Sequence, residues 1–168
     1  MNYLGFNKKE LSDTVNKLNQ LLADYHVYYQ NLRNFHWNVE GQNFFALHTQ
    51  FEELYQDARA KIDEIAERVL TLRSRPTSTM SEYLENSKVK ESGKVSEDLK
   101  MVQALLQNHK DLIASMREVI QSAEEAGDEG TVDMISGFLG YIEKKSWMLD
   151  AFAAKQNMPE HAMNGDRK

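Results

Sequence analysis

Residues 73–94 have the sequence RSRPTSTMSEYLENSKVKESGK, a polar stretch between two halves of the chain that both show helical apolar spacing. Pro76, Gly93 and several serines argue against one continuous helix here, although a short helical turn is expected around Ser81–Glu85. Fully extended, 22 residues reach about 70 Å. A helix of about 30 residues is only about 45 Å long. The stretch can therefore return along the whole length of a long helix.

On either side of this stretch, apolar side chains recur every three or four residues, as in Leu11, Val15, Leu18 and Leu22. That period places one apolar stripe on a helix. Breaks occur at the Glu40-Gly41 pair and over residues 126–130, where glycines and acidic residues cluster. The pattern predicts four long helices, over residues 8–38, 43–72, 95–125 and 131–155, followed by a flexible polar tail over residues 158–168.

The order of connections predicts the topology. The first and third connections are only a few residues long, so the helices that they join should lie antiparallel, whereas the second is long enough for a crossover. With 168 residues, the chain is expected to form a single domain over residues 1–168. The predicted fold is all-α: a four-helix bundle with a long crossover between helices two and three that carries a short helix.

Composition limits the function classes. The formal net charge is −6, which argues against a surface built mainly for nucleic acid, since phosphate binding needs clustered Lys and Arg. There is no cysteine, so disulfides and thiolate metal sites are excluded. No apolar run approaches the roughly 20 residues of a membrane span, and residues 1–10 lack a signal-peptide core. A cytoplasmic location without membrane contact is the default expectation.

The candidate metal ligands lie in the first two predicted helices. In many di-iron bundles, a Glu three residues before a His supplies two ligands from one helix. No histidine in this chain is preceded by Glu at that spacing, so the usual centre inside the bundle is not expected. The remaining candidates are two histidines and three carboxylates: His36, His48, Glu52, Asp63 and Glu67.

Their spacing argues against one metal site within one chain. Asp63 and Glu67 share a helix face, but His48 and Asp63 are 15 residues apart, which is about 22 Å along a straight helix. If two copies of the helix pack antiparallel about a twofold axis near Gln56, His48 of one copy meets Asp63 of the other, and two identical sites form. Spacing alone leaves open the plainer alternative of hydrogen-bonding histidines and a solvated acidic face.

Three segments then indicate a family. They are NFHWNVEG at residues 34–41, NFFALH at residues 43–48 and IDEIAER at residues 62–68. The second His comes twelve residues after the first, and Asp-x-x-x-Glu begins fifteen residues later. These segments resemble the Dps family, DNA-binding proteins from starved cells, and the resemblance extends over nearly the whole chain.

The resemblance implies a ferritin-like bundle, a homo-oligomer of twelve subunits, and ferroxidase sites at twofold interfaces. It implies an enzyme that oxidises Fe²⁺, usually with hydrogen peroxide rather than oxygen, and stores the ferric product inside the cage, which protects the cell from oxidative damage. The iron would be shared between two subunits. His36 and His48 would come from one subunit and the catalytic carboxylates Asp63 and Glu67 from its neighbour, with Glu52 near the iron.

Other aromatic residues and histidines have weaker implications. In the family, Trp37, beside the first ligand, would quench oxidising equivalents, while its size favours an interface anchor. Tyr25, Tyr28 and Tyr29 fit core and interface packing better than redox relays. His109 falls on the apolar stripe of the third helix and is expected to be structural.

The resemblance also implies iron-entry pores near the start of the fourth helix. Asp128, Glu129 and Asp133 are acidic in that region, and three copies around an axis would attract cations. Helix capping is the alternative, because acidic side chains favour helix N-termini.

DNA binding has little support in the sequence. Its basic residues near the termini are Lys8, Lys9, Arg167 and Lys168, against an acidic chain. We expect DNA binding to be weak or absent. The alternatives to a ferroxidase are a non-enzymatic nucleoid protein that protects DNA, and a purely structural cage or adhesin.

Overall fold

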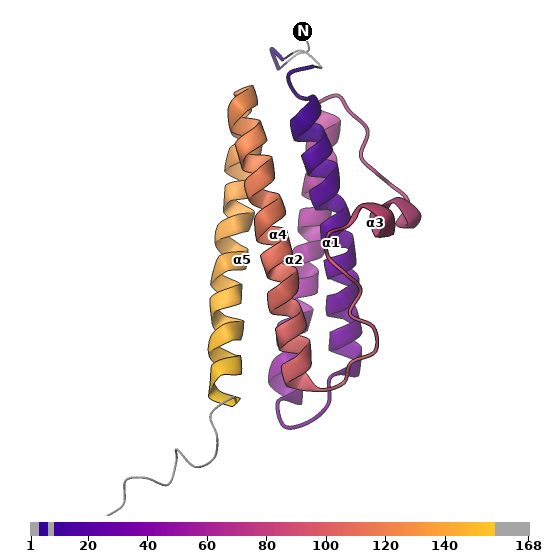
Figure 1. Cartoon of the computed structure of the whole chain (residues 1–168), viewed down its shortest axis with the longest axis vertical. Coiled ribbons are helices and arrows are strands. Elements are labelled where there is room, and N and C mark those ends of the chain that lie inside the picture. The colour runs from indigo at the N-terminus through magenta and orange to yellow at the C-terminus, as the bar shows by residue number, and fades with distance from the viewer. Residues whose placement is uncertain (1–3, 7–8, 157–168) are drawn as a thin grey trace, which may run out of the picture.

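A computed structural model describes residues 4–6 and 9–156 of the chain. Within these ranges the regular elements are five helices: α1 (Ser12–Asn38), α2 (Phe44–Thr71), α3 (Met80–Asn86), α4 (Asp98–Ala126) and α5 (Glu129–Gln156). The four long helices lie side by side as a bundle, and α3 lies outside it against α1 (Figure 1). The predicted all-α fold is therefore confirmed. The tail over residues 158–168 lies outside the described residues.

The predicted crossover is also confirmed. The chain leaves α2 at one end of the bundle, passes through α3, and enters α4 at the opposite end (Figure 1). The short helix begins at a capping box, in which the Thr79 side chain accepts from the Glu82 backbone and the Glu82 side chain accepts from the Thr79 backbone. The ring of Tyr83 stacks on His26 of α1, with centroids 3.8 Å apart. The crossover is thus packed against the bundle.

The helix ends differ from the predicted ones by a few residues. The first helix begins at Ser12 rather than at residue 8, because residues 9–11 form a turn. The third begins at Asp98 rather than at residue 95. The last begins at Glu129 rather than at residue 131, because the left-handed Gly127 (φ 69°) ends α4 so sharply that α5 starts two residues later.

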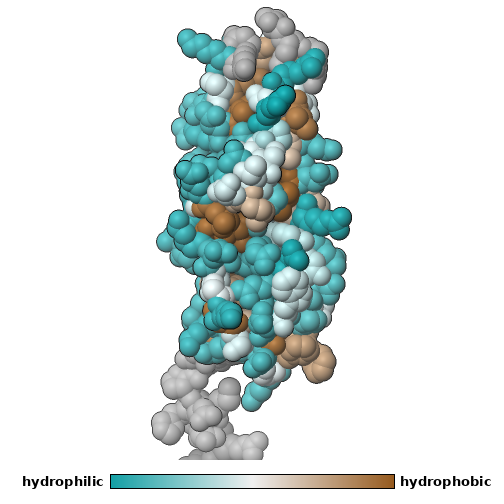
Figure 2. All heavy atoms as spheres, turned by 90° about the vertical axis from the view of Figure 1, so that its right-hand side faces the viewer, coloured by the Kyte–Doolittle hydropathy of each residue, from teal (hydrophilic) through white to brown (hydrophobic). Residues whose placement is uncertain are grey.

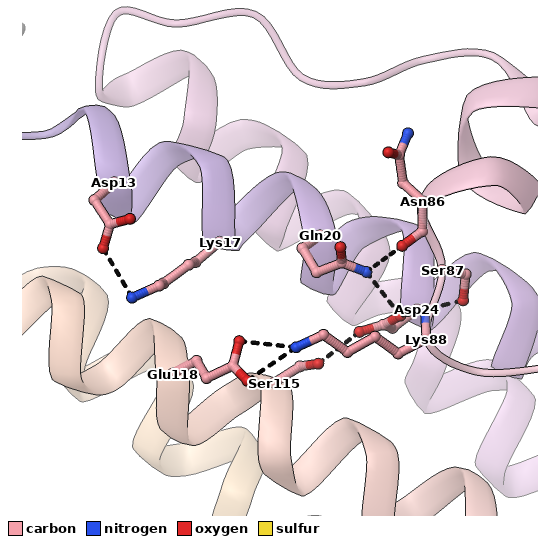
Figure 3. Close-up of polar contacts among 9 residues, drawn as sticks. All are labelled: Asp13, Lys17, Gln20, Asp24, Asn86, Ser87, Lys88, Ser115 and Glu118. Carbon is pink, nitrogen blue, oxygen red and sulfur yellow. Dashed lines mark hydrogen bonds and ion pairs between the residues drawn. The ribbon is translucent and has the colours of Figure 1, made fainter.

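A buried carboxylate, Asp24 of α1, holds the crossover in place (Figure 3). It accepts hydrogen bonds from the Ser115 hydroxyl of α4 at 2.7 Å, the Lys88 backbone N–H at 2.6 Å and the Ser87 hydroxyl at 3.1 Å. Gln20, one turn earlier on α1, donates a further bond at 3.2 Å. Burial raises the pKa of the Asp24 carboxyl, and its hydrogen bonds oppose that shift. One side chain therefore ties together α1, α4 and the segment after α3.

We expect Asp24→Ala to lower the free energy of unfolding by about 2–4 kcal/mol, because several buried donors would lose their acceptor together. The control is Asp13→Ala, which removes the exposed ion pair with Lys17 on the same helix (Figure 3) and should change stability little. Denaturant unfolding of both variants measures the difference. Equal effects of the two substitutions would contradict the role given to Asp24.

The core lies between the four long helices, and the predicted apolar stripes form it. Its largest fully buried side chains include Tyr25, Tyr28, Phe35 and Phe51. The expectation that Tyr25 and Tyr28 are core residues is confirmed, while Tyr29 is only partly buried.

The face that carries the crossover is mainly hydrophilic, with small apolar patches (Figure 2). Met80 and Leu84 of α3 are among the exposed apolar side chains. None of the helices in the described ranges is both long and apolar enough to cross a bilayer.

Candidate metal centre

Two histidines meet where α1 ends and α2 begins. The loop between the helices is short, so His36 near the end of α1 faces His48 in the second turn of α2. Their rings stack with centroids 3.8 Å apart and planes inclined by 22°. Both side chains are half-buried. The structure therefore brings together the two predicted imidazole ligands within one chain.

Each histidine is oriented by the backbone of the other. The distance from His36 Nδ1 to the His48 carbonyl oxygen is 2.9 Å, and that from His48 Nδ1 to the His36 carbonyl oxygen is 2.8 Å. A carbonyl oxygen only accepts, so Nδ1 carries the proton in both rings. In the neutral form of each ring, Nε2 then has the lone pair, which is the form of imidazole that binds a metal. The reciprocal bonds therefore fix the orientation of two imidazoles whose Nε2 atoms are available as ligands.

Two aromatic residues that are not among the predicted site residues pack on this pair. Phe44, one turn before His48, stacks on the His48 ring at 5.0 Å, and the i, i+4 spacing could have indicated it. The ring of Tyr55 stands edge-on to His36 at 5.3 Å. These rings restrict the orientations open to both imidazoles.

Glu52 lies one turn beyond His48 on α2 and is half-buried. Its Oε1 accepts from the Tyr55 hydroxyl at 3.4 Å and from Gln56 Nε2 at 3.2 Å. Burial and the neighbouring Glu52 carboxylate raise the pKa of the Tyr55 hydroxyl, which stays protonated as a donor. These bonds hold the Glu52 carboxylate toward Tyr55 and Gln56, and its place near the iron stays a prediction.

Asp63 and Glu67 are not brought to the histidines within the chain. Both lie on the continuous helix α2 and are exposed, and the 15 residues from His48 to Asp63 still correspond to about 22 Å. Within residues 4–6 and 9–156, no three His, Asp or Glu side chains gather into one metal-binding group. Closing the predicted site requires a second subunit.

Trp37 extends from the end of α1 into solvent in the isolated subunit, with 59% of its surface exposed. The guanidinium carbon of Arg33 lies 4.7 Å from the centroid of its ring. A tryptophan with this exposure is available to an interface. Its anchoring role and its redox role both stay predictions.

The acidic residues at the start of α5 have two different environments. Asp128 is buried, pairs with Arg68 of α2, and accepts from the Thr131 backbone N–H at 3.1 Å. Its carboxylate therefore caps α5, which was the alternative to a pore role. Glu129 and Asp133 are exposed.

A family model for the ferritin-like domain matches residues 15–158. The DNA protection during starvation protein of Porphyromonas gingivalis is 46% identical over 154 residues, which cover 90% of this chain and 95% of that relative. This chain belongs to the Dps family of ferritin-like proteins. A second such protein, from Bacillus anthracis, is 41% identical over 80% of this chain and 92% of its own length.

The Dps crystal structure from Vibrio cholerae, described as a member of a broad superfamily of ferritin-like diiron-carboxylate proteins, superposes with a TM-score of 0.88. It is 40% identical, and the match covers 90% of this chain and 96% of that one. The sequence-based resemblance and the ferritin-like fold are therefore confirmed. Membership of the Dps family supports a role in iron storage and protection.

Proposed function

We propose that this Dps-family chain is a ferroxidase that oxidises Fe²⁺ with hydrogen peroxide and stores the ferric product within a cage of twelve copies. The observation that supports it best is the stacked His36–His48 pair, in which each Nδ1 lies within hydrogen-bond distance of the opposite backbone carbonyl and leaves Nε2 for a metal. Imidazole suits iron, and carboxylate oxygens suit its ferric product. Fe²⁺ is the substrate of this site rather than a resident cofactor.

The site would be shared across a twofold axis near Gln56. His36, His48 and Glu52 of one subunit would face the carboxylates of Asp63 and Glu67 on the other. The part of α2 around this axis borders a hollow on the surface of the isolated subunit, lined by Gln56, Arg59, Ala60, Ile62 and Asp63. An antiparallel α2 pair makes two such sites at once, because a twofold interface is isologous.

The residues bind the iron, and the substrates supply the electrons and the oxidant. Two Fe²⁺ ions give two electrons to one hydrogen peroxide molecule, which takes up two protons and leaves as two water molecules, and two Fe³⁺ ions remain. The neutral imidazoles bind Fe²⁺ without adding charge, and the carboxylates stabilise the additional positive charge of Fe³⁺. Few protein ligands leave positions open for peroxide and water.

Two further assignments accompany this proposal. Glu129 and Asp133, exposed at the start of α5, would line an acidic pore about a threefold axis and attract Fe²⁺. Asp128 would position them by capping α5 and binding Arg68. Trp37 would be buried at a subunit interface close to the iron, where its indole is also oxidisable.

The test is to load the purified protein with Fe²⁺ without oxygen, add hydrogen peroxide and determine the size of the product. Rapid oxidation with the iron retained in a particle of about twelve subunits supports the proposal. Slow oxidation in a particle of that size would contradict the ferroxidase activity but would still support the twelve-subunit cage.

We expect no stable complex with plasmid DNA at physiological salt, because the chain carries a net charge of −6 and a cage multiplies it. Weak binding at low salt is compatible with this expectation. A gel-shift titration across salt concentrations measures it. Tight binding at physiological salt would instead favour the nucleoid alternative.

A further inference from the structure

Tyr28 and His109 form a buried hydrogen-bonded pair in the bundle core, away from the histidines of the metal centre. The Tyr28 hydroxyl lies 2.9 Å from His109 Nε2. His109 Nδ1 lies 2.8 Å from the Ser146 hydroxyl oxygen, which is 2.7 Å from the Ile142 carbonyl oxygen. The prediction that His109 is a core residue is confirmed, and its bonds also define where the protons lie.

The direction of each hydrogen bond follows from the last acceptor of the series, the Ile142 carbonyl. The Ile142 carbonyl only accepts, so the Ser146 hydroxyl uses its hydrogen there. Ser146 must then accept from His109, whose Nδ1 carries the proton. His109 Nε2 therefore has the lone pair, and Tyr28 donates to it. Tyr28 is a phenol with a neutral base already in place for its proton.

The surroundings favour this arrangement. Tyr28 and His109 are each only 1% exposed. Burial, with a further contribution from the nearby Lys61 ammonium, lowers the pKa of His109 to about 3. The imidazole is therefore neutral at physiological pH and free to accept. Burial also raises the pKa of the Tyr28 hydroxyl well above its ordinary value, so the phenol gives up a proton only when it is oxidised.

Aromatic residues of α1 and α2 lie between the metal centre and this pair. His36 contacts Tyr55 at a centroid distance of 5.3 Å, and Tyr55 contacts Tyr29 at 6.1 Å. Tyr25 lies one turn from Tyr29 on α1, and its ring is 6.1 Å from that of Tyr28. The ring contacts at both ends and the one-turn spacing between Tyr29 and Tyr25 divide the path of an electron into short steps.

The neighbouring Tyr25 lacks the feature that makes Tyr28 suitable. Its hydroxyl is buried and, within the described part of the chain, has no hydrogen-bond partner. An oxidised phenol becomes a strong acid and needs a base for its proton. Tyr25 has no such base, whereas Tyr28 is hydrogen-bonded to a neutral imidazole.

We propose that Tyr28 is a redox-active residue that supplies one electron to peroxide when only one Fe²⁺ occupies the centre, with His109 as the acceptor of its proton. The proposal rests on the ferroxidase function proposed above. The chain has no cysteine, so no thiol competes for the oxidising equivalent. The pair would thus prevent a single Fe²⁺ from releasing a hydroxyl radical.

The step balances. Hydrogen peroxide takes one electron from Fe²⁺ and one from Tyr28, and with two protons from solvent it becomes two water molecules. Fe³⁺ remains at the centre, Tyr28 becomes a neutral tyrosyl radical, and its phenolic proton rests on His109 Nε2. A later Fe²⁺ ion returns the electron and becomes Fe³⁺, and the proton returns from His109 to Tyr28.

The test uses the assembled protein loaded without oxygen with one Fe²⁺ per site, mixed with one equivalent of hydrogen peroxide and frozen. Electron paramagnetic resonance should show a tyrosyl radical, and ring-deuterated tyrosine should change its splitting, which separates it from a Trp37 radical. Tyr28→Phe should lose most of the signal, measured per Fe³⁺ formed in the same sample. Tyr83→Phe is the control, since Tyr83 lies on α3 and donates to the Thr77 carbonyl, and it should keep the signal.

His109→Gln separates the proton acceptor from the hydrogen bond, because glutamine accepts from Tyr28 but takes no proton at neutral pH. Its radical yield should also fall. Two outcomes would overturn this inference: rapid Fe²⁺ oxidation in the wild-type protein without a tyrosyl radical, or an unchanged radical yield in Tyr28→Phe. Neither outcome would contradict the proposed ferroxidase function. Failure to oxidise Fe²⁺ at all would contradict both proposals.

Discussion

Replacing both His36 and His48 with alanine should slow rapid Fe²⁺ oxidation by roughly 100-fold or more, since changes around a metal ligand already cost 10–100-fold. The reason is local: both Nε2 lone pairs disappear, and only carboxylates remain around the iron. Stopped-flow oxidation of Fe²⁺ by hydrogen peroxide measures the rate, and size-exclusion chromatography shows whether the cage still assembles.

A second pair of substitutions separates ligation from structure. Asparagine at positions 36 and 48 can still donate from its amide to the opposite carbonyl, as Nδ1 does now, but it has no counterpart of Nε2. His36→Asn/His48→Asn should therefore assemble well and oxidise slowly. His26→Ala, on α1 but stacked on Tyr83, is the control and should keep its rate. Rapid oxidation by the asparagine variant would show that the histidines are not iron ligands.

Neutralising the two exposed carboxylates of α2 should have an effect of similar size. Asp63→Asn/Glu67→Gln keeps the shape of both side chains but removes the negative charges that stabilise Fe³⁺, so we expect roughly 100-fold slower oxidation. Both side chains are far from the histidines of their own chain, so only a shared site predicts this loss. Stopped-flow oxidation under the same conditions measures it.

The matched control for the carboxylate pair is Glu64→Gln. Glu64 is another exposed acid on the same helix, and it is not one of the predicted ligands. The Glu64→Gln variant should oxidise Fe²⁺ at the wild-type rate. Equal slowing in the control would mean that general negative charge on α2, rather than ligation, governs the reaction.

The helices were predictable because the apolar stripes have the helical period, as from Leu11 to Leu22 in α1. Helix ends were less predictable because they depend on local turns. Leu11 continues the stripe and is buried, yet it precedes α1 as its N-cap. The start of α5 depends on Gly127 and on the cap that Asp128 provides, and periodicity does not detect either.

The candidate site was predictable in its residue types and in part of its geometry. A short loop between antiparallel helices places His36 near His48, and fifteen residues of helix keep Asp63 away. The reciprocal bonds from Nδ1 to the opposite carbonyl depend on how the two backbones approach, which no sequence pattern specifies. The contact of Tyr55 with His36 likewise joins two helices.

The acidic residues at the start of α5 show a different limit of prediction from sequence. Asp128, Glu129 and Asp133 look alike as a cluster, but one of them is buried and the other two are exposed. The difference comes from Arg68, sixty residues earlier, which pairs with Asp128. A partner this far away in the sequence decides which carboxylate faces solvent. A local sequence pattern does not reveal such a partner.

The central claim is that each site is shared between two subunits, and mixing two inactive variants tests it most directly. Subunits with His36→Ala/His48→Ala and subunits with Asp63→Asn/Glu67→Gln are dissociated, combined in equal amounts and reassembled. A mixed pair about the twofold axis has one intact site and one doubly altered site, so random pairing should restore about a quarter of the wild-type rate. No recovery in reassembled cages would contradict a shared site.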